Sequence, residues 1–261
     1  MKWLFLMAEE TRVRDEIPFY DFLPYQYGPF SFTVYQELAR LEKMGLIADD
    51  LSIPKDVQRD VADAVSRLSQ VVLDDADRIL DRYGDMAHDE LIDDVYARYD
   101  WFASRSKLRP PHERQPASPS VFTTGYEGES VDAFLNKLLA AGIERVLDVR
   151  KNAYSQKYGF SRAPLKTNCE KVDIEYRHLP ELGIPSDMRT DLSTRELRKR
   201  LFVTYERELL PRQSDAKKRA AELLQERATV LLCVERHHED CHRGTLAPHL
   251  ARMTGLPIAH I

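Results

Sequence analysis

Residues 229–234 read Thr-Val-Leu-Leu-Cys-Val, a short and almost wholly apolar run. Such a run is typical of a strand that is buried on both faces, as the strands of parallel sheets are. Further strands are expected at residues 121–124 (VFTT), 145–149 (RVLDV) and 174–179, and residues 257–261 form a candidate last strand. These runs decide the fold class of the second half of the chain.

Helical segments separate the expected strands. Residues 130–141 predict a helix with Ser130 as the N-cap and Gly142 as the C-terminal stop. Further helices are expected at 192–210, 215–227 and 243–253. The alternation of strands and helices predicts an α/β domain over residues 120–261, with a Rossmann-like parallel sheet and helices on both faces.

A Pro-rich segment at residues 107–119 (KLRPPHERQPASP) predicts a linker, because its four prolines forbid a helix. Residues 1–106 before it read as a mostly helical, winged-helix-like domain. Helices are expected at 32–45, at 56–80 as one long helix, and at 91–99, with a small wing after Leu46-Ile47. Residues 19–30 are too aromatic and turn-rich for a helix.

Composition and charge exclude several classes of protein. With 43% hydrophobic and 31% charged residues, the 261-residue chain has enough apolar material for a packed core. No apolar run reaches the roughly 18 residues of a membrane-spanning helix, so no membrane role is expected. Three cysteines are too few for a disulfide framework, which favours a reducing cytoplasm.

The net charge of −5 is unevenly distributed. Residues 49–99 carry 14 acidic against 6 basic side chains, whereas the chain after residue 116 is slightly basic. A basic groove across the whole molecule is therefore excluded, and any nucleic-acid contact must be local. The acidic helical region 49–99 favours a protein partner over DNA.

Polar side chains gather where three of the expected strands end. Ligands of open α/β sheets bind beyond these carboxyl ends, so we expect the side chains to line one pocket. The expected substrate-binding residues are Tyr126, Glu127, Arg150, Arg162 and Arg243, and the expected catalytic residues are Asp148, Glu235, Cys241 and His242.

Cys241 lies just before the helix expected to begin near residue 242, where the helix dipole favours a thiolate. It is a candidate nucleophile, with His242 or Glu235 as the proton carrier. The alternative is a half-buried cysteine that only caps the helix. Cys233 reads as a core residue of its strand, with a redox disulfide to Cys241 as the second interpretation.

Each of the remaining candidate residues has both a functional and a structural interpretation. Arg150 and Arg243 suit anionic groups, but Asp148 at a strand end often pairs with a neighbouring arginine instead. Glu127 and Glu235 suit acid/base work, and Tyr126 suits either ring stacking or the core edge. The loop 152–162 interleaves aromatic residues and cations, which is typical of nucleic-acid binding or of a mobile lid.

Several residues between 233 and 242 are zinc-competent, namely Cys233, Glu235, His237, His238, Cys241 and His242. Their spacing matches no standard structural zinc pattern, and no second ligand pair is evident elsewhere. No metal site is therefore predicted, although the sequence leaves open whether Cys233, Glu235, Cys241 and His242 hold an ion. The cofactor requirement is unknown.

Four ordered motifs resemble the domain-of-unknown-function 488 family. They are 124–128 (TGYEG), 148–150 (DVR), 179–183 (LPELG), and 232–235 (LCVE) leading into 241–243 (CHR). The resemblance covers residues 120–261 and implies a Rossmann-like fold, but no reaction. Residues 27–31 (YGPFS) and 42–47 (EKMGLI) resemble the winged-helix-like domains of Panacea-type antitoxin proteins.

Two classes of function follow from these observations. The first is an enzyme that holds a nucleotide-like or nucleic-acid-derived anionic substrate at the strand ends. The second is a non-catalytic ligand-sensing regulator, or an antitoxin- or defence-type interaction protein. Turnover, as opposed to ligand binding alone, separates the two classes.

Overall fold

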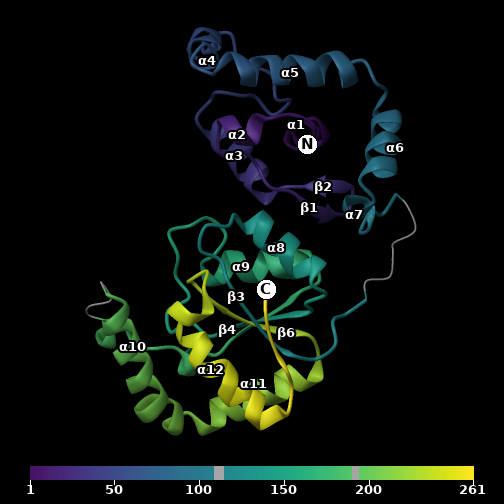
Figure 1. Cartoon of the computed structure of the whole chain (residues 1–261). Helices are drawn as coiled ribbons and strands as arrows, with labels where there is room; N and C mark the ends of the chain where they lie inside the picture. Colours follow the sequence, from purple (N-terminus) through teal and green to yellow (C-terminus); the bar gives the residue numbers. More distant parts are fainter. Residues whose placement is uncertain (109–114, 190–193) are drawn as a thin grey trace. The chain divides into compact units, whose positions relative to one another are not determined.

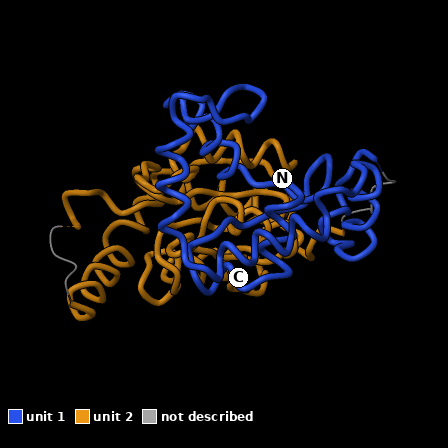
Figure 2. Tube along the Cα trace, turned by 90° about the horizontal axis from the view of Figure 1, so that it is seen from above, with its two compact units in different colours: residues 1–112 blue, residues 113–261 orange. Residues whose placement is uncertain are grey.

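The structure is a computed structural model that describes residues 1–108, 115–189 and 194–261. The chain forms two compact units, residues 1–112 and 113–261, which Figure 2 shows in different colours. Residues 109–114 of the predicted linker 107–119 lie outside the described residues, as do residues 192 and 193 of the predicted helix 192–210. Among the described residues, no helix has the length and apolar character needed to cross a membrane.

The second unit is built on a five-stranded sheet in which every paired strand is parallel. Its spatial order is β5-β4-β6-β3-β7. All five residues of β6 are buried, as the apolar run predicts. The strands are β3 (Val121–Gly125), β4 (Arg145–Asp148), β5 (Glu175–His178), β6 (Thr229–Cys233) and β7 (Ile258–His260).

Helices cover both faces of this sheet (Figure 1). Helices α8 (Val131–Ala140) and α9 (Arg162–Lys171) lie on one face, and α11 (Ser214–Glu226) and α12 (His242–Thr254) lie on the other. The side chain of Ser130 accepts the hydrogen bond of the Ala133 amide, so the predicted N-cap of α8 is confirmed. The parallel α/β sheet is confirmed as well.

Two segments of this unit differ from the prediction. Helix α9 was not predicted, because residues 162–171 are mostly polar and contain a proline; its buried face holds only Leu165, Asn168 and Cys169. The expected helix 192–210 is α10 (Arg195–Thr204), followed by a π-helical turn, η3 (Tyr205–Leu209), and a 3₁₀ turn, η4 (Leu210–Arg212). The described residues of this unit also form the 3₁₀ turns η1 (Pro180–Leu182), η2 (Ser186–Met188) and η5 (His238–Asp240).

The connections of the sheet reverse around β6. The helices that follow β3 and β4, its two neighbours, lie on one face, whereas α12, which follows β6, lies on the other (Figure 1). The chain after β6 therefore leaves the sheet towards one face, whereas the chain after β3 and the chain after β4 leave it towards the other face. Such reversal points are where open α/β sheets leave room for a ligand.

The first unit is mostly helical, with one small hairpin. Phe5 of α1 packs edge-on against Phe22, Tyr99 and Phe102 and forms the centre of an aromatic core. The elements are α1 (Lys2–Glu10), α2 (Val13–Glu16), β1 (Leu23–Tyr25), β2 (Gly28–Phe30), α3 (Phe32–Lys43), α4 (Gln58–Val65), α5 (Gln70–Tyr83), α6 (His88–Arg98) and α7 (Asp100–Ala103).

Two expectations for the first unit are wrong. The long helix 56–80 is broken into α4 and α5, because Ser69 accepts the hydrogen bond of the Val72 amide and caps a new helix. The wing expected after residue 47 is not found: residues 46–57 contain no strand, and the antiparallel hairpin β1–β2 instead precedes α3.

Candidate functional site

The ends of β4, β6 and β3 are neighbours in the sheet, and two glycines permit close backbone contacts around them. A Cβ atom on Gly125, the last residue of β3, would lie 1.8 Å from the carbonyl oxygen of Glu235 after β6. A Cβ on Gly183 would lie 2.1 Å from the amide nitrogen of Lys151 after β4. The motif at 124–128 thus contains the glycine that permits contact between the ends of β3 and β6. The motif at 179–183 contains the glycine that permits the segment after β5 to contact the end of β4.

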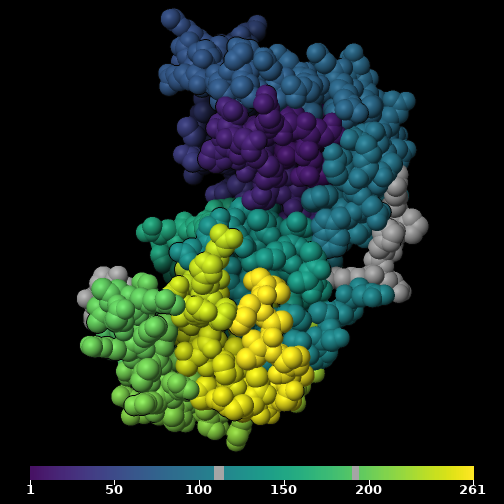
Figure 3. Space-filling view, viewed as in Figure 1, coloured from purple at the N-terminus to yellow at the C-terminus, as the bar shows by residue number. Residues whose placement is uncertain are grey.

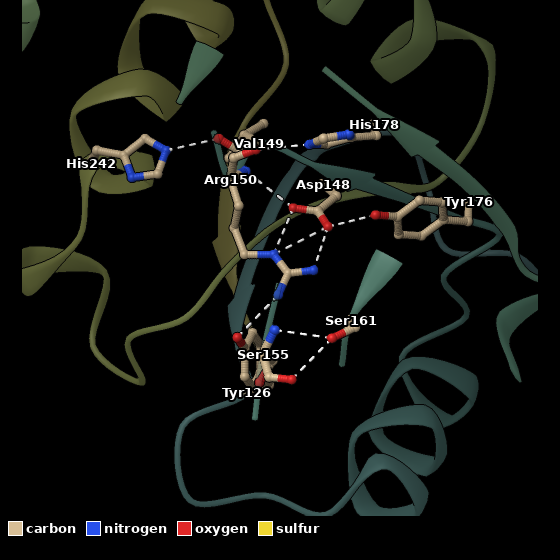
Figure 4. A network of polar contacts seen from close by, with 9 residues as sticks. All are labelled: Tyr126, Asp148, Val149, Arg150, Ser155, Ser161, Tyr176, His178 and His242. Atoms are coloured by element: carbon tan, nitrogen blue, oxygen red, sulfur yellow. Dashed lines mark hydrogen bonds and ion pairs between the residues drawn. The ribbon is translucent and has the colours of Figure 1, made fainter. Parts of the chain in front are cut away.

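At the end of β4, Asp148 and Arg150 form a closed network (Figure 4). The Arg150 Nη2 and Nε atoms donate to the Asp148 carboxylate over 2.6 and 2.9 Å, and the Tyr176 hydroxyl donates to it over 2.6 Å. The Arg150 Nη1 atom donates to the Tyr126 hydroxyl over 3.0 Å. Ion pairing with Asp148 raises the pKa of Arg150, although burial alone would lower it.

This network gives partners within the chain to three residues whose predicted roles face a substrate. Arg150 is 2% exposed and Asp148 is fully buried, so neither is open to a substrate. Tyr126 is also buried, and its ring stacks on that of Phe160 at 4.1 Å. The structural interpretation of the Asp148–Arg150 pair, and of Tyr126 as a residue of the core edge, therefore describes the fold.

Arg243 and Arg162 also differ from expectation. Arg243 is 1% exposed, and its Nη1 and Nη2 atoms donate to the carbonyl oxygens of Glu235 and Arg236 over 2.6 and 2.9 Å. It thus secures the loop after β6 and does not face the pocket described below. Arg162 is exposed at the first residue of α9, outside that pocket. Phe160 of the loop 152–162 is fully buried, which anchors that loop.

The residues around the end of β6 form a second group, which we call the thiol–imidazole cluster: Cys233, Cys241 and His242. The His242 Nδ1 atom lies 3.6 Å from the Cys233 Sγ atom and 3.8 Å from the Cys241 Sγ atom. One potential ligand atom of each residue lies within 4.8 Å of the other two, and all three side chains are buried. Glu235 lies beside them, with its Oε2 atom 3.3 Å from the Cys233 Sγ atom.

The imidazole of His242 is held in one orientation. Its Nε2 atom lies 3.1 Å from the Val149 carbonyl oxygen, a hydrogen bond visible in Figure 4. A carbonyl oxygen only accepts, so Nε2 carries a proton, and in the neutral imidazole Nδ1 presents its lone pair to the two sulfur atoms. The ring of Tyr205, in the π-helical turn, packs edge-on against the imidazole at 5.5 Å.

The protonation of this cluster differs from the prediction for Cys241. Burial, with the neighbouring Cys233 adding to it, raises the pKa of the Cys241 thiol well above its ordinary value. This direction is opposite to the thiolate that the helix dipole favours, and the Cys241 side chain is only 2% exposed. Burial alone would raise the pKa of Glu235, but hydrogen bonds from Cys241 and Cys233 lower it overall.

A pocket of about 330 Å³ opens over Glu235 and His242. Its far wall comes from α10 together with Ile184 and Arg189. Two ion pairs connect α10 to the η5 turn: Arg195 with Glu239 and Arg198 with Asp240. Figure 3 shows the green residues of α10 against the yellow-green residues before α12. The lining residues are Glu127, Ile184, Arg189, Arg198, Leu201, Phe202, Glu235, His237, Asp240 and His242.

Of the predicted site residues, the structure brings Glu127, Glu235 and His242 to the pocket, with Cys241 behind them. The Glu127 carboxylate accepts the Arg236 amide over 2.9 Å, which joins the ends of β3 and β6. Sequence reasoning missed Arg189 and Arg198. Residues 195–200 are rich in basic side chains, but only the structure shows that Arg198 is the one that lines the pocket.

Comparisons with known proteins bear on this unit alone. No curated protein and no solved structure matches the chain. Residues 130–250, which include β4, β6, the thiol–imidazole cluster and most of α12, match a family described as "Domain of unknown function DUF488". The second unit therefore contains a domain that is similar to this family over those residues.

Proposed function

We propose that the second unit is an enzyme that binds an anionic, nucleotide-like or nucleic-acid-derived substrate in the pocket at the end of β6. The observation that carries the proposal is the combination of side chains lining this pocket. Glu235 follows β6 and His242 begins α12, and Arg189 and Arg198 come from the opposite wall. A volume of about 330 Å³ is within the range of small-molecule sites, about 300–1,000 Å³.

The two arginines replace Arg150 and Arg243 as the groups that would hold phosphate. Guanidinium groups bind phosphate oxygens with paired hydrogen bonds. Arg189 lines the pocket and forms no ion pair with another residue in the described parts of the chain, and we propose it as the principal phosphate-binding group. The carboxylates of Glu127, Glu235 and Asp240 are acceptors for sugar hydroxyls or base amino groups. A nucleotide carries both kinds of group.

The test is turnover by the full chain. Purified protein is incubated with nucleoside mono-, di- and triphosphates and with short single-stranded oligonucleotides, and products are separated by chromatography. We expect Glu235→Gln to lower kcat by about 10²–10⁴-fold, as for loss of a general acid or base. Arg189→Ala should raise KM about 10–100-fold, the loss of one charged hydrogen bond.

Arg252→Ala is the matched control, because Arg252 is exposed on α12 outside the pocket. It should leave both constants unchanged. Binding of a nucleotide without turnover would contradict the enzyme and support the ligand-sensing regulator. If neither binding nor turnover is seen with any probe, the pocket assignment is wrong.

A regulator remains the second candidate, because the acidic region 49–99 offers an interaction surface. Helix α4 has no buried residue, and Val65 and Leu68 are 44% and 40% exposed next to its acidic side chains. A protein partner with basic and apolar groups would fit this region.

Free thiols at Cys169, Cys233 and Cys241 agree with a reducing compartment, for which we propose the cytoplasm.

A further inference from the structure

We infer that Cys233, Cys241 and His242 bind a zinc ion at the end of β6. This inference deepens the proposed function, since it concerns the same pocket, but the metal site stands on its own geometry. It reverses the prediction of no metal, which relied on sequence spacing.

The two sulfur-to-nitrogen distances in the thiol–imidazole cluster match those around tetrahedral zinc. With Zn–S bonds of about 2.3 Å and Zn–N bonds of about 2.0–2.1 Å, tetrahedral geometry places sulfur and nitrogen ligands about 3.6 Å apart. The His242 Nδ1 atom lies 3.6 and 3.8 Å from the sulfur atoms of Cys233 and Cys241. All three potential ligand atoms lie within 4.8 Å of one another.

The second observation is the hydrogen bond on the far side of the imidazole. A histidine that binds a metal almost always donates its other ring N–H to a carbonyl or a carboxylate. The Nε2 atom of His242 does so to the Val149 carbonyl oxygen at 3.1 Å. The lone pair on Nδ1 therefore points at the two sulfur atoms, which is the arrangement that a metal site requires.

Burial argues for ligands and against a substrate nucleophile. Cys233 and Cys241 are 1% and 2% exposed, and neither lines the pocket, whereas His242 and Glu235 do. An ion between the two sulfur atoms and Nδ1 would lie just below the pocket floor. Zinc with three protein ligands keeps a fourth position for water or substrate, and two cysteines with one histidine is a known catalytic set.

Sequence spacing missed the site because its ligands come from two structural elements. Cys233 ends β6, and Cys241 and His242 begin α12; the η5 turn between them folds the chain back. His237 and His238, which were also candidates, lie elsewhere. His238 stacks on His260 at 3.6 Å, and His237 lines the pocket wall.

The experiment measures metal content and metal spectra of the full chain purified under reducing conditions. We expect about one zinc per chain by elemental analysis, falling to near zero in Cys233→Ala and Cys241→Ala. Cys169→Ala is the matched control, because Cys169 is equally buried but lies in α9 outside the cluster. It should keep the full equivalent. Circular dichroism shows whether each variant is folded.

A readout on the unmodified chain covers the case in which the cysteine variants unfold. Replacing zinc by Co²⁺ should give a thiolate-to-cobalt charge-transfer band and the intense visible bands of a tetrahedral ion. A weak octahedral spectrum, or a full equivalent of zinc in folded Cys241→Ala, would overturn the inference. So would a Cys233–Cys241 disulfide in the protein purified with reductant.

The two proposals fail in different ways. Zinc binding without turnover of any nucleotide probe would leave the metal site in place and contradict the enzyme. If the chelator-treated chain turns over a nucleotide but binds neither zinc nor Co²⁺, the enzyme proposal stands and the metal site is contradicted.

Discussion

Two polar groups lie at neighbouring strand ends of the same sheet, and they differ in how completely the chain satisfies them. At the end of β4, the charges of Asp148 and Arg150 are buried and bonded to each other and to two tyrosine hydroxyls. Beyond β6, two thiols and an imidazole lone pair converge under a pocket. The first group is complete within the protein. The second has the arrangement of a site that needs a ligand.

The largest effect is expected at Asp148. Replacing it by Asn leaves the buried guanidinium of Arg150 without a counter-ion. Removing one partner of a buried ion pair typically costs about 3–5 kcal/mol. Chemical denaturation should show that loss in the free energy of unfolding. A cost below about 1 kcal/mol would mean that another anionic group pairs with Arg150, so that the network does not depend on Asp148 alone.

The next effect tests how the two groups are joined. Gly125→Ala places a methyl group against the Glu235 carbonyl and forces β3 and β6 apart, at a cost of about 3 kcal/mol. The zinc content of the Gly125→Ala variant should fall together with its stability. Gly128→Ala is the comparison, since a Cβ there meets nothing within 4 Å and the cost is only that of its positive φ, about 1–2 kcal/mol. Normal zinc content in Gly125→Ala would show that zinc binding does not depend on the close contact at Gly125.

Tyr176→Phe removes one donor from the closed group without touching the cluster. The lost hydrogen bond to the Asp148 carboxylate should lower the free energy of unfolding by about 1.5–3 kcal/mol. Tyr154→Phe, at a tyrosine that is 73% exposed, should stay within about 0.5 kcal/mol of wild type. Metal content should be unchanged in both. A zinc loss in Tyr176→Phe would show that the two groups are coupled.

The smallest effect concerns the opposite end of the sheet. Hydrogen bonds from Arg145 and Arg177 lower the pKa of Glu175 against the effect of burial. A carboxylate with a depressed folded pKa stabilises the protein above its ordinary pKa of 4.5, and that contribution is lost as the pH falls towards the folded value. It should amount to about 1 kcal/mol.

Denaturation at a series of pH values between neutral and acid measures this contribution. Stability should fall less steeply below pH 4.5 in Glu175→Gln than in wild type. Equal slopes in the two proteins would assign the acid sensitivity to other carboxylates.

Local patterns predicted the elements well where one physical signal dominated. The apolar run at β6 and the Ser130 cap of α8 are such cases, and both are confirmed. The break between α4 and α5 was missed because apolar residues keep helical spacing through it, while the Ser69 cap decides the boundary. Helix α9 was missed because its buried face is too small to set a clear period.

The site was predicted less completely, because a sequence shows which strand end a residue follows but not where its side chain turns. Arg150 and Arg243 follow the correct strand ends, yet both turn inward to partners in the chain. Arg189 and Arg198 reach the pocket from a segment that no strand pattern identifies. The zinc ligands likewise depend on a reversal of the chain that residue spacing does not reveal.

The π-helical turn at Tyr205–Leu209 gives the molecule an unusual sensitivity to chain length. A π turn contains one residue more than the α-helical turn it replaces. Deleting a single residue there would restore a regular helix and rotate everything on one side by about 100°. Tyr205, which now touches His242 and donates to the Leu182 carbonyl oxygen, would swing away from both. A one-codon deletion in this turn would thus remodel the pocket while every side chain that lines it stayed unchanged.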